Sequence, residues 1–288
     1  MDASFLLVQL FNGIQYGLLL FFIASGLTLI FGILGIINLA HGAFYMLGAY
    51  MAYWLAALSG SLVLAILGSV AAMAVMGFLI ERFLMVHLYH RNHLDQVLLT
   101  YGLILILNEA QRLAWGNDVH GVAIPAMVDF SFRLTNGMAF PFYRVLLAGL
   151  CAVLAVGMFL VIQKTRFGIW IRAGASNREM VSAMGIDIKM LSGIVFAAGA
   201  AMSGFAGAVV TPLSSVYPGM GDAVIVISFV VVVIGGIGSV KGAFFGALLI
   251  GIADTFGRVL LPELASLLVY AVMATILLWR PQGLFVRA

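Results

Sequence analysis

The chain has 288 residues, of which 64% are hydrophobic and only 9% are charged, and its formal net charge is +3. Soluble domains carry about 25% charged residues, so this composition and the mean hydropathy of +1.17 exclude a soluble domain and indicate a membrane protein. The basic residues flank apolar segments, where they set membrane orientation, and we do not expect nucleic-acid binding.

Apolar runs long enough to cross a bilayer take up most of the chain. A hydrocarbon core of about 30 Å needs about 20 apolar residues per helix. The sequence predicts eight spans and a weaker ninth, at 5–31, 33–58, 61–80, 142–163, 190–212, 222–240, 243–261 and 264–280, with the ninth at 97–115. We therefore expect an all-α polytopic bundle of eight or nine spans, forming one domain over 1–288 with no separate soluble catalytic domain.

Two glycine-rich stretches interrupt these runs, FGILGIINLAHGAF at 31–44 and IGGIGSVKGAF at 234–244. Both stretches contain the same short motif, His or Lys followed by Gly-Ala-Phe. Gly-interrupted segments in matching places point to broken or re-entrant helices near a transport path. The candidate pathway residues are Asn38, His41, Gly42, Gly235, Gly236 and Gly238. Packing hydrogen bonds would explain Asn38 and His41 equally well.

No nucleotide or metal site is expected on this chain. Lys241 follows Val240 rather than the pattern G-x-x-x-x-G, and no Walker motif occurs, so any ATP hydrolysis would belong to another chain. His87, His90 and His93 cannot share one metal ion on a helix, because His87 and His93 would point about 120° apart.

Ionisable side chains inside spans are costly and are functional candidates by default. Glu109 and Arg112 are three residues apart, and Asp254 and Arg258 are four apart. Each acid therefore has a cation on its own helix face, and we predict two ion pairs that neutralise their charges near span ends.

Basic residues concentrate in three regions: the first polar loop, the loop 164–189 and the C-terminus. They are Arg82, Arg91, Lys164, Arg166, Arg172, Arg178, Lys189, Arg280 and Arg287. The loop 116–141 has only Arg133, and 213–221 has none. Since Lys and Arg are enriched in cytoplasmic loops, we predict that 164–189 and the C-terminus are cytoplasmic, and that the N-terminus and 116–141 lie outside.

The loop 164–189 contains a predicted short helix. Ser176 and Glu179 form the pattern S-x-x-E, in which each side chain caps the other's backbone N–H. Gly185 suits the left-handed conformation that ends a helix. The pattern predicts a helix over 177–184.

One side of this helix is apolar, with Met180, Val181 and Met184 spaced to lie together. Such a stripe in a cytoplasmic loop needs to be buried. The helix would either lie flat on its own bundle or insert into a groove of a soluble partner.

Four stretches of the sequence resemble one family. RAGASNREMVSAMGI, with Glu179 and Gly185 six apart, resembles the E-A-A-x-x-x-G loop of ABC importer permeases, and more specifically that of the branched-chain amino acid (Liv) type. GLTLIFGILGIINLAHGAFYMLGAY, VVVVIGGIGSVKGAFFGALLIG and LLWRPQGLF resemble the same family in order, so the resemblance covers effectively the whole chain. Met180 and Val181 stand where the general pattern has two alanines.

The resemblance implies a permease subunit of the bacterial inner membrane that moves branched-chain or related amino acids by alternating access and is not an enzyme. It implies a second permease subunit in a heterodimer, two ATP-binding subunits that hold ATP and Mg, and an extracytoplasmic substrate-binding protein facing 116–141. The residues expected to couple to the ATPase are Ser176, Arg178, Glu179, Met180, Val181, Met184 and Gly185.

Two other classes of protein compete with this interpretation. An ion-coupled secondary transporter of small polar solutes would also explain acids and broken helices in the membrane. An intramembrane enzyme would need a nucleophile and a base at matching depths, and the sequence places no Ser-Lys or Ser-His pair in that way.

Overall fold

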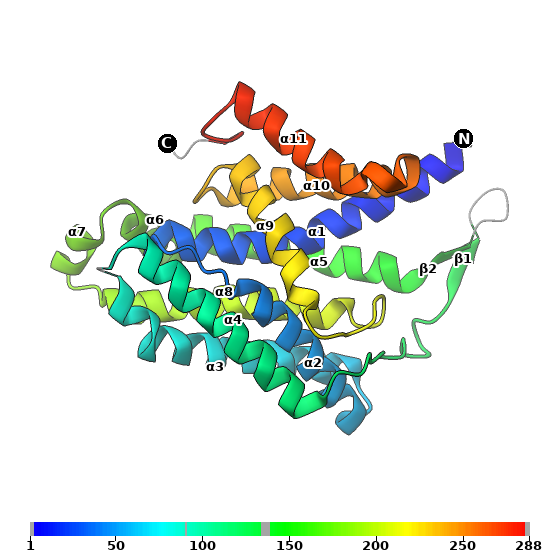
Figure 1. Ribbon diagram of the computed structural model, residues 1–288, viewed down its shortest axis with the longest axis horizontal. Coiled ribbons are helices and arrows are strands. Elements are labelled where there is room, and N and C mark those ends of the chain that lie inside the picture. The colour runs from blue at the N-terminus through cyan, green and yellow to red at the C-terminus, as the bar shows by residue number, and fades with distance from the viewer. Residues whose placement is uncertain (1–2, 90, 134–138, 286–288) are drawn as a thin grey trace.

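The computed structural model describes residues 3–89, 91–133 and 139–285. These residues form a bundle of α-helices whose long members run along the longest axis of the molecule (Figure 1). The predicted all-α polytopic fold is therefore confirmed. The longer helices are α1 (Ala3–Leu34), α3 (Leu62–Phe83), α4 (His93–Trp115), α5 (Phe142–Lys164), α8 (Ile188–Val210) and α10 (Val240–Leu260). The shorter ones are α2 (His41–Ser59), α6 (Arg166–Ser176), α7 (Arg178–Ala183), α9 (Met220–Gly235) and α11 (Ala265–Trp279).

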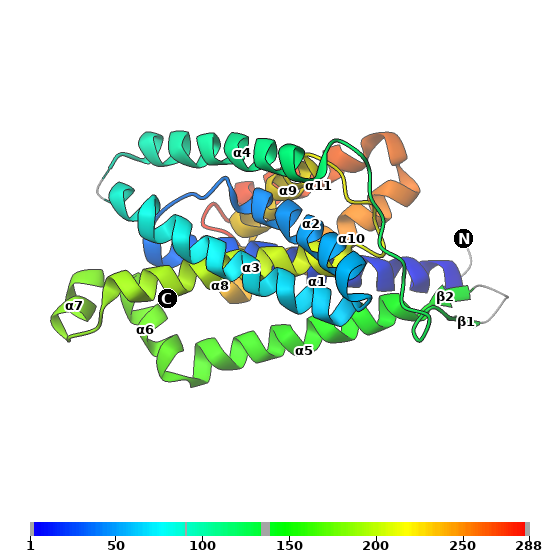
Figure 2. The ribbon, with the colours of Figure 1, turned by 90° about the horizontal axis from the view of Figure 1, so that it is seen from below.

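The loop predicted to be external, 116–141, lies at the end of the bundle opposite α7 (Figure 2). It carries two short antiparallel strands, β1 (Ser131–Arg133) and β2 (Ala139–Pro141), while its residues 134–138 lie outside the described residues. His120 and Val216 exchange backbone hydrogen bonds of 2.9 and 2.8 Å. The loop after α4 and the loop before α9 therefore meet at this end.

Seven helical segments of the described residues are long and apolar enough to cross a membrane. They are α1, α3, α4, α5, α8, α10, and α11 with the turn before it. The weaker ninth span is thus a full-length helix, α4. The predictions of continuous spans at 33–58 and 222–240 were wrong, because a helix break lies within each range. The first range holds the shorter helix α2 and the second holds the shorter helix α9.

Helix α1 is the centre of the bundle, with 89% of its most apolar 18-residue stretch buried. Glycines let α10 approach it closely. A Cβ atom placed on Gly13 would lie 2.9 Å from the Cα atom of Ile252, and one on Gly17 would lie 2.8 Å from the carbonyl oxygen of Ala247. A third close approach joins α1 to α8, where a Cβ atom on Gly199 would lie 2.7 Å from the side chain of Ile30. Small residues at these contacts replace the hydrophobic force that is missing between helices in lipid.

The two predicted interruptions are real breaks. Helix α1 ends at Leu34, and Gly35 follows with a φ of +67°, the left-handed conformation that ends helices. His41 then starts α2, with its Nε2 atom 3.0 Å from the carbonyl oxygen of Ile23. Because Ile23 is eleven residues before the end of α1, α2 begins about 16 Å back inside the bundle.

Helices α2 and α9 begin at the same place. A Cβ atom on Gly42 would lie 2.5 Å from the carbonyl oxygen of Gly221, so the first turns of the two helices touch. From this contact α2 runs toward Trp115 and His120, whose rings pack near Tyr50. Helix α9 runs the other way, toward the start of α10 (Figure 1). Two interrupted helices therefore begin together in the middle of the bundle.

We predict that Gly17→Val destabilises the protein, because the new side chain would separate α1 from α10. Overpacking of this kind costs about 1–3 kcal/mol. The single cysteine, Cys151, is buried, so a thiol-reactive fluorogenic dye reports unfolding of the detergent-purified chain as temperature rises. The matched control is Gly149→Val in α5, where a Cβ atom would meet no heavy atom within 4 Å. Equal melting temperatures for the two variants would contradict the packing described here.

Candidate functional site

Helix α7 forms a tip at one end of the molecule (Figures 1 and 2). Its cap differs from the prediction. The side-chain oxygen of Asn177 accepts a 2.9 Å hydrogen bond from the backbone N–H of Met180, whereas Ser176 is the last residue of α6. Helix α6 continues through Ser176 because the N–H of Asn177 still bonds to the carbonyl of Ala173. The helix predicted over 177–184 is thus six residues long, capped by Asn177, and Gly185 follows with the expected left-handed φ of +83°.

The apolar residues of α7 divide between two faces. Val181 is only 3% exposed and packs against the bundle, whereas Met180 and Met184, the residue that ends the helix, are 60% and 73% exposed. Glu179 is exposed beside them. Methionine is flexible and is common at surfaces that bind partner helices or grooves. Helix α7 therefore has one anchored side and one outward side of two methionines and an acid.

Arg178 ties α7 to two long helices. Its Nη2 atom donates a 3.1 Å hydrogen bond to the hydroxyl of Ser192 on α8, and its guanidinium lies 4.8 Å from the centre of the Tyr89 ring. The Tyr89 hydroxyl donates to the carboxylate of Glu81 on α3. Glu81 is buried between α3 and α8, next to Gly193. The first residue of α7 is thereby connected to both helices.

Tyr89 keeps its proton in this cluster. It lies in the connection between α3 and α4, outside the spans. Burial, followed by the hydrogen bond to the Glu81 carboxylate, raises the pKa of Tyr89 above its usual value. The phenol therefore stays a donor to Glu81 at neutral pH. Of this cluster the sequence indicated only Arg178, because nothing in the spacing of Glu81, Tyr89 and Ser192 links them to the loop.

The glycine-rich residues predicted to line a path are mostly packed in the interior. Asn38 and His41 are fully buried. Gly42 touches the first turn of α9, and Gly235 touches the first turn of α10, where a Cβ atom would lie 2.5 Å from the carbonyl oxygen of Gly242. Gly236 is likewise buried, whereas Gly238 lines a cavity at the α7 end of the bundle.

A polar cavity of about 570 Å³ opens at the end opposite α7. Asp254 and Arg258 line it and form the predicted ion pair, with 2.7 Å between the carboxylate Oδ2 and the arginine Nε. Arg144, at the start of α5, also lines the cavity and donates a 2.9 Å hydrogen bond to Asn12 of α1. The sequence did not single out Asn12 or Arg144. An arginine in the first turn of a span was a usable signal, but its partner lies 132 positions away.

The other predicted ion pair also forms but lies elsewhere. Glu109 and Arg112 are 3.5 Å apart on α4, and both side chains are more than half exposed. Figure 2 shows α4 on the outside of the bundle, on the side opposite α5. This pair therefore neutralises charge on an outer helix and does not line the cavity that holds Asp254 and Arg258.

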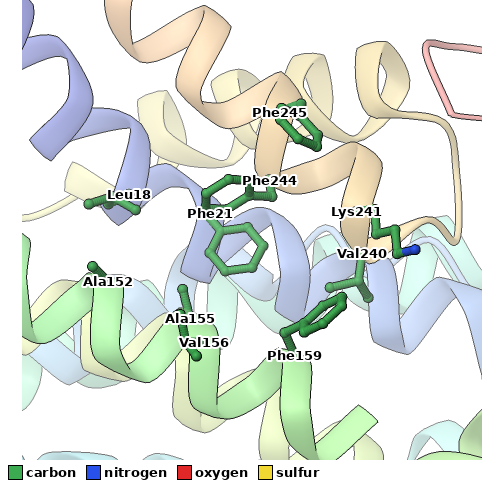
Figure 3. A pocket seen from close by; sticks show the side chains of 10 residues that line it. All are labelled: Leu18, Phe21, Ala152, Ala155, Val156, Phe159, Val240, Lys241, Phe244 and Phe245. Carbon is green, nitrogen blue, oxygen red and sulfur yellow. The ribbon is translucent and has the colours of Figure 1, made fainter. Parts of the chain in front are cut away.

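A second polar cavity of about 570 Å³ lies at the α7 end, lined by Arg172, Ser239 and Lys241. It adjoins an apolar groove of about 410 Å³ between α1, α5 and α10. There Phe21 lies against Phe244, and Phe159 lies beside Val240 and Lys241 (Figure 3). The two polar cavities share no lining residue. The bundle therefore carries polar openings at opposite ends, with packed helices between them.

No group of three or more His, Cys, Asp or Glu side chains that could hold a metal ion is found among the residues that the structure describes. His90 of the histidine triplet lies outside them.

Interrupted helices inside an apolar bundle, with polar cavities at both ends, are typical of membrane transport proteins. The sequence profile of the family described as "Branched-chain amino acid transport system / permease component" matches residues 9–277. The chain belongs to this family. It is a multi-pass permease subunit of the inner membrane and not an enzyme.

Curated relatives match over nearly the full chain. The high-affinity branched-chain amino acid transport system permease protein BraD of Pseudomonas aeruginosa is 31% identical, covering 98% of this chain and 96% of its own. The corresponding protein LivH of Escherichia coli is 30% identical, covering 100% and 98%. A second permease protein of that organism, LivM, is 27% identical over 90% of this chain and 66% of its own. No solved structure matches significantly.

We predict that Asn177→Ala loosens α7, because it removes the oxygen that caps the helix. Loss of such a cap costs about 1 kcal/mol. Amide hydrogen exchange across 178–184 should become several-fold faster, measured by mass spectrometry on the purified protein. Ser176→Ala is the matched control and should leave the exchange unchanged. Faster exchange in Ser176→Ala, with no change in Asn177→Ala, would show instead that Ser176 caps the helix.

Proposed function

We propose that this chain is a translocation subunit of an ATP-driven importer of branched-chain amino acids, in which α7 receives the motion of an ATP-binding subunit. The observation that carries the proposal is the form of α7: two exposed methionines and an acid outside, and an arginine tied to α3 and α8 inside. The family and the names of the relatives support the substrate class.

The α7 end is assigned to the cytoplasm. Arg82, Arg166, Arg172, Lys189 and Lys241 all belong to segments at that end, and an excess of Lys and Arg favours the cytoplasmic side. The N-terminus, 116–141 and the cavity at Asp254 and Arg258 then face outward. A substrate-binding protein would dock on the outer loops.

The remaining subunits follow from the same proposal. LivH and LivM are two permease proteins of one organism and both are similar to this chain, which supports a heterodimer with a second permease. Two ATP-binding subunits would hold ATP and Mg and press on α7.

The contacts suggest how force reaches the bundle. Glu179, Met180 and Met184 would lie in a cleft of the ATP-binding subunit, as helices do in hydrophobic grooves. Movement of α7 would pull Arg178, and through Ser192 it would pull α8. The ring of Tyr89 and the carboxylate of Glu81 would carry the same movement to α3. Because α8 packs on α1 and α2 through glycines, a shift of α8 would change both polar cavities.

The proposal is tested with proteoliposomes that contain either this chain alone or the complete system with its ATP-binding subunits and binding protein. Only the complete system should take up labelled leucine, and only with ATP inside the compartment that holds the ATPase. A protonophore should leave this uptake unchanged. Uptake by the chain alone, driven by an ion gradient, would favour a secondary transporter and overturn the proposal.

In the same assay Arg178→Gln should reduce leucine uptake about tenfold or more while ATP hydrolysis continues, because α7 would be detached from α3 and α8. Arg166→Gln is the matched control, since Arg166 is an exposed arginine of the same loop. Equal uptake in the two variants would show that Arg178 does not transmit the motion.

A further inference from the structure

We infer that the outward cavity between α1, α9 and α10 is a binding site for a zwitterionic amino acid, with Arg144 and Arg258 for its carboxylate and Asp254 for its ammonium. This inference rests on the proposed function and assigns that function a site. The cavity is about 570 Å³ and is lined by both charged and aliphatic side chains.

Each of the two arginines is held by one hydrogen bond and has further N–H donors available for a ligand. Arg258 gives its Nε to Asp254, and Arg144 gives one terminal nitrogen to Asn12. Within the described residues, the other N–H groups of both guanidiniums have no hydrogen-bond partner. Guanidinium groups bind carboxylates through paired N–H donors. Two oriented arginines on one cavity therefore suit a ligand with a carboxylate.

Asp254 supplies the opposite charge. Its side chain is only 7% exposed, whereas that of Arg258 is 65% exposed. A buried carboxylate is costly in a membrane unless it is paired, and here one arginine pairs with one of its oxygens while the residue still lines the cavity. A ligand ammonium would find an anionic partner beside the guanidiniums, as a zwitterion requires.

Aliphatic side chains complete the site. Leu19 of α1 and Val224 and Ile227 of α9 line the same cavity. They provide an apolar surface for a branched aliphatic side chain, while Gln15 and Tyr16 add polar groups from α1. The ion pair of α4 offers a contrast, since Glu109 and Arg112 are both largely exposed on the outside of the bundle.

The inference predicts that leucine protects a cysteine placed in the cavity. The experiment uses right-side-out membrane vesicles with the permease and ATP-binding subunits but without the substrate-binding protein, which would cover the outer loops, and a chain in which Cys151→Ala removes the native thiol. Thr255→Cys lies in the cavity, and Asp118→Cys on the exposed outer loop is the matched control. Leucine should slow modification of Thr255→Cys by a charged methanethiosulfonate about fivefold and leave Asp118→Cys unaffected.

Leucine analogues and arginine variants test the assigned roles. 4-Methylpentanoate lacks the ammonium and 3-methylbutylamine lacks the carboxylate, so neither should protect. Arg144→Gln should abolish protection by leucine, Arg144→Lys should retain part of it, and Arg112→Gln should leave it intact. A normal labelling rate of Asp118→Cys in each variant shows that the protein is folded.

The inference is overturned if leucine fails to protect Thr255→Cys, protects both cysteines equally, or still protects fully after Arg144→Gln. ATP-driven uptake of leucine by the unmodified system is measured in the same kind of vesicles after the substrate-binding protein is added. Uptake without protection would overturn only the assignment of this binding site, whereas absence of uptake would overturn the proposed function itself.

Discussion

Direct packing of glycine against backbone holds this bundle together, because lipid supplies no hydrophobic force between helices. Gly13 and Gly17 let α10 approach α1, and Gly199 lets α8 approach it from another side. This packing also permits the breaks. Irregular backbone is tolerated at membrane depth only where protein covers it. Between α1 and α2, Gly35 is exposed directly after the end of α1, whereas Ile36, Asn38 and Ala40 are fully buried. One constraint thus accounts for both the rigid centre and the interrupted helices.

Helix α7 depends on this centre but is not part of it. Val181 and Arg178 attach it, and the rest of its surface is exposed. A six-residue helix is too short to be stable alone, so the cap of Asn177, the contacts of Arg178 and the burial of Val181 hold it in shape. An element attached at few points can transmit a displacement without being absorbed into the core. The proposed coupling uses this property.

The sequence predicted much of the architecture because hydropathy and glycine are local signals. Most of the spans follow from runs of about 20 apolar residues, and the two breaks, both ion pairs and the left-handed Gly185 are patterns within a few residues. The predictions were wrong where contacts between residues distant in sequence determine the helix ends and the buried side chains. Ser176 and Asn177 are both good caps, and the length of α6 selects Asn177. The run 33–58 is mostly apolar, but α1 ends at Leu34 and α2 begins only at His41, which packs against α1. Met180 and Val181 are adjacent in sequence, and only the position of the bundle shows which one is buried.

The polar cavities were harder to foresee for the same reason. Arg144 and Asn12 are 132 positions apart, and the link from Arg178 to Glu81 through Tyr89 joins segments that no periodicity relates. Long-range polar contacts between helices leave no spacing rule in a single sequence. The glycine-rich stretches indicated where helices break, but they did not indicate which side chains face open space.

The central claim is that a separate ATP-binding chain binds the exposed face of α7, which carries Glu179, Met180 and Met184. The most direct measurement is site-specific photo-crosslinking of the complete transport system, from a benzophenone attached to Met184→Cys in the Cys151→Ala background. The account predicts a crosslinked product between this chain and a subunit that binds radiolabelled ATP. Crosslinks confined to lipid or to this chain itself, with the ATPase present and active, would contradict it.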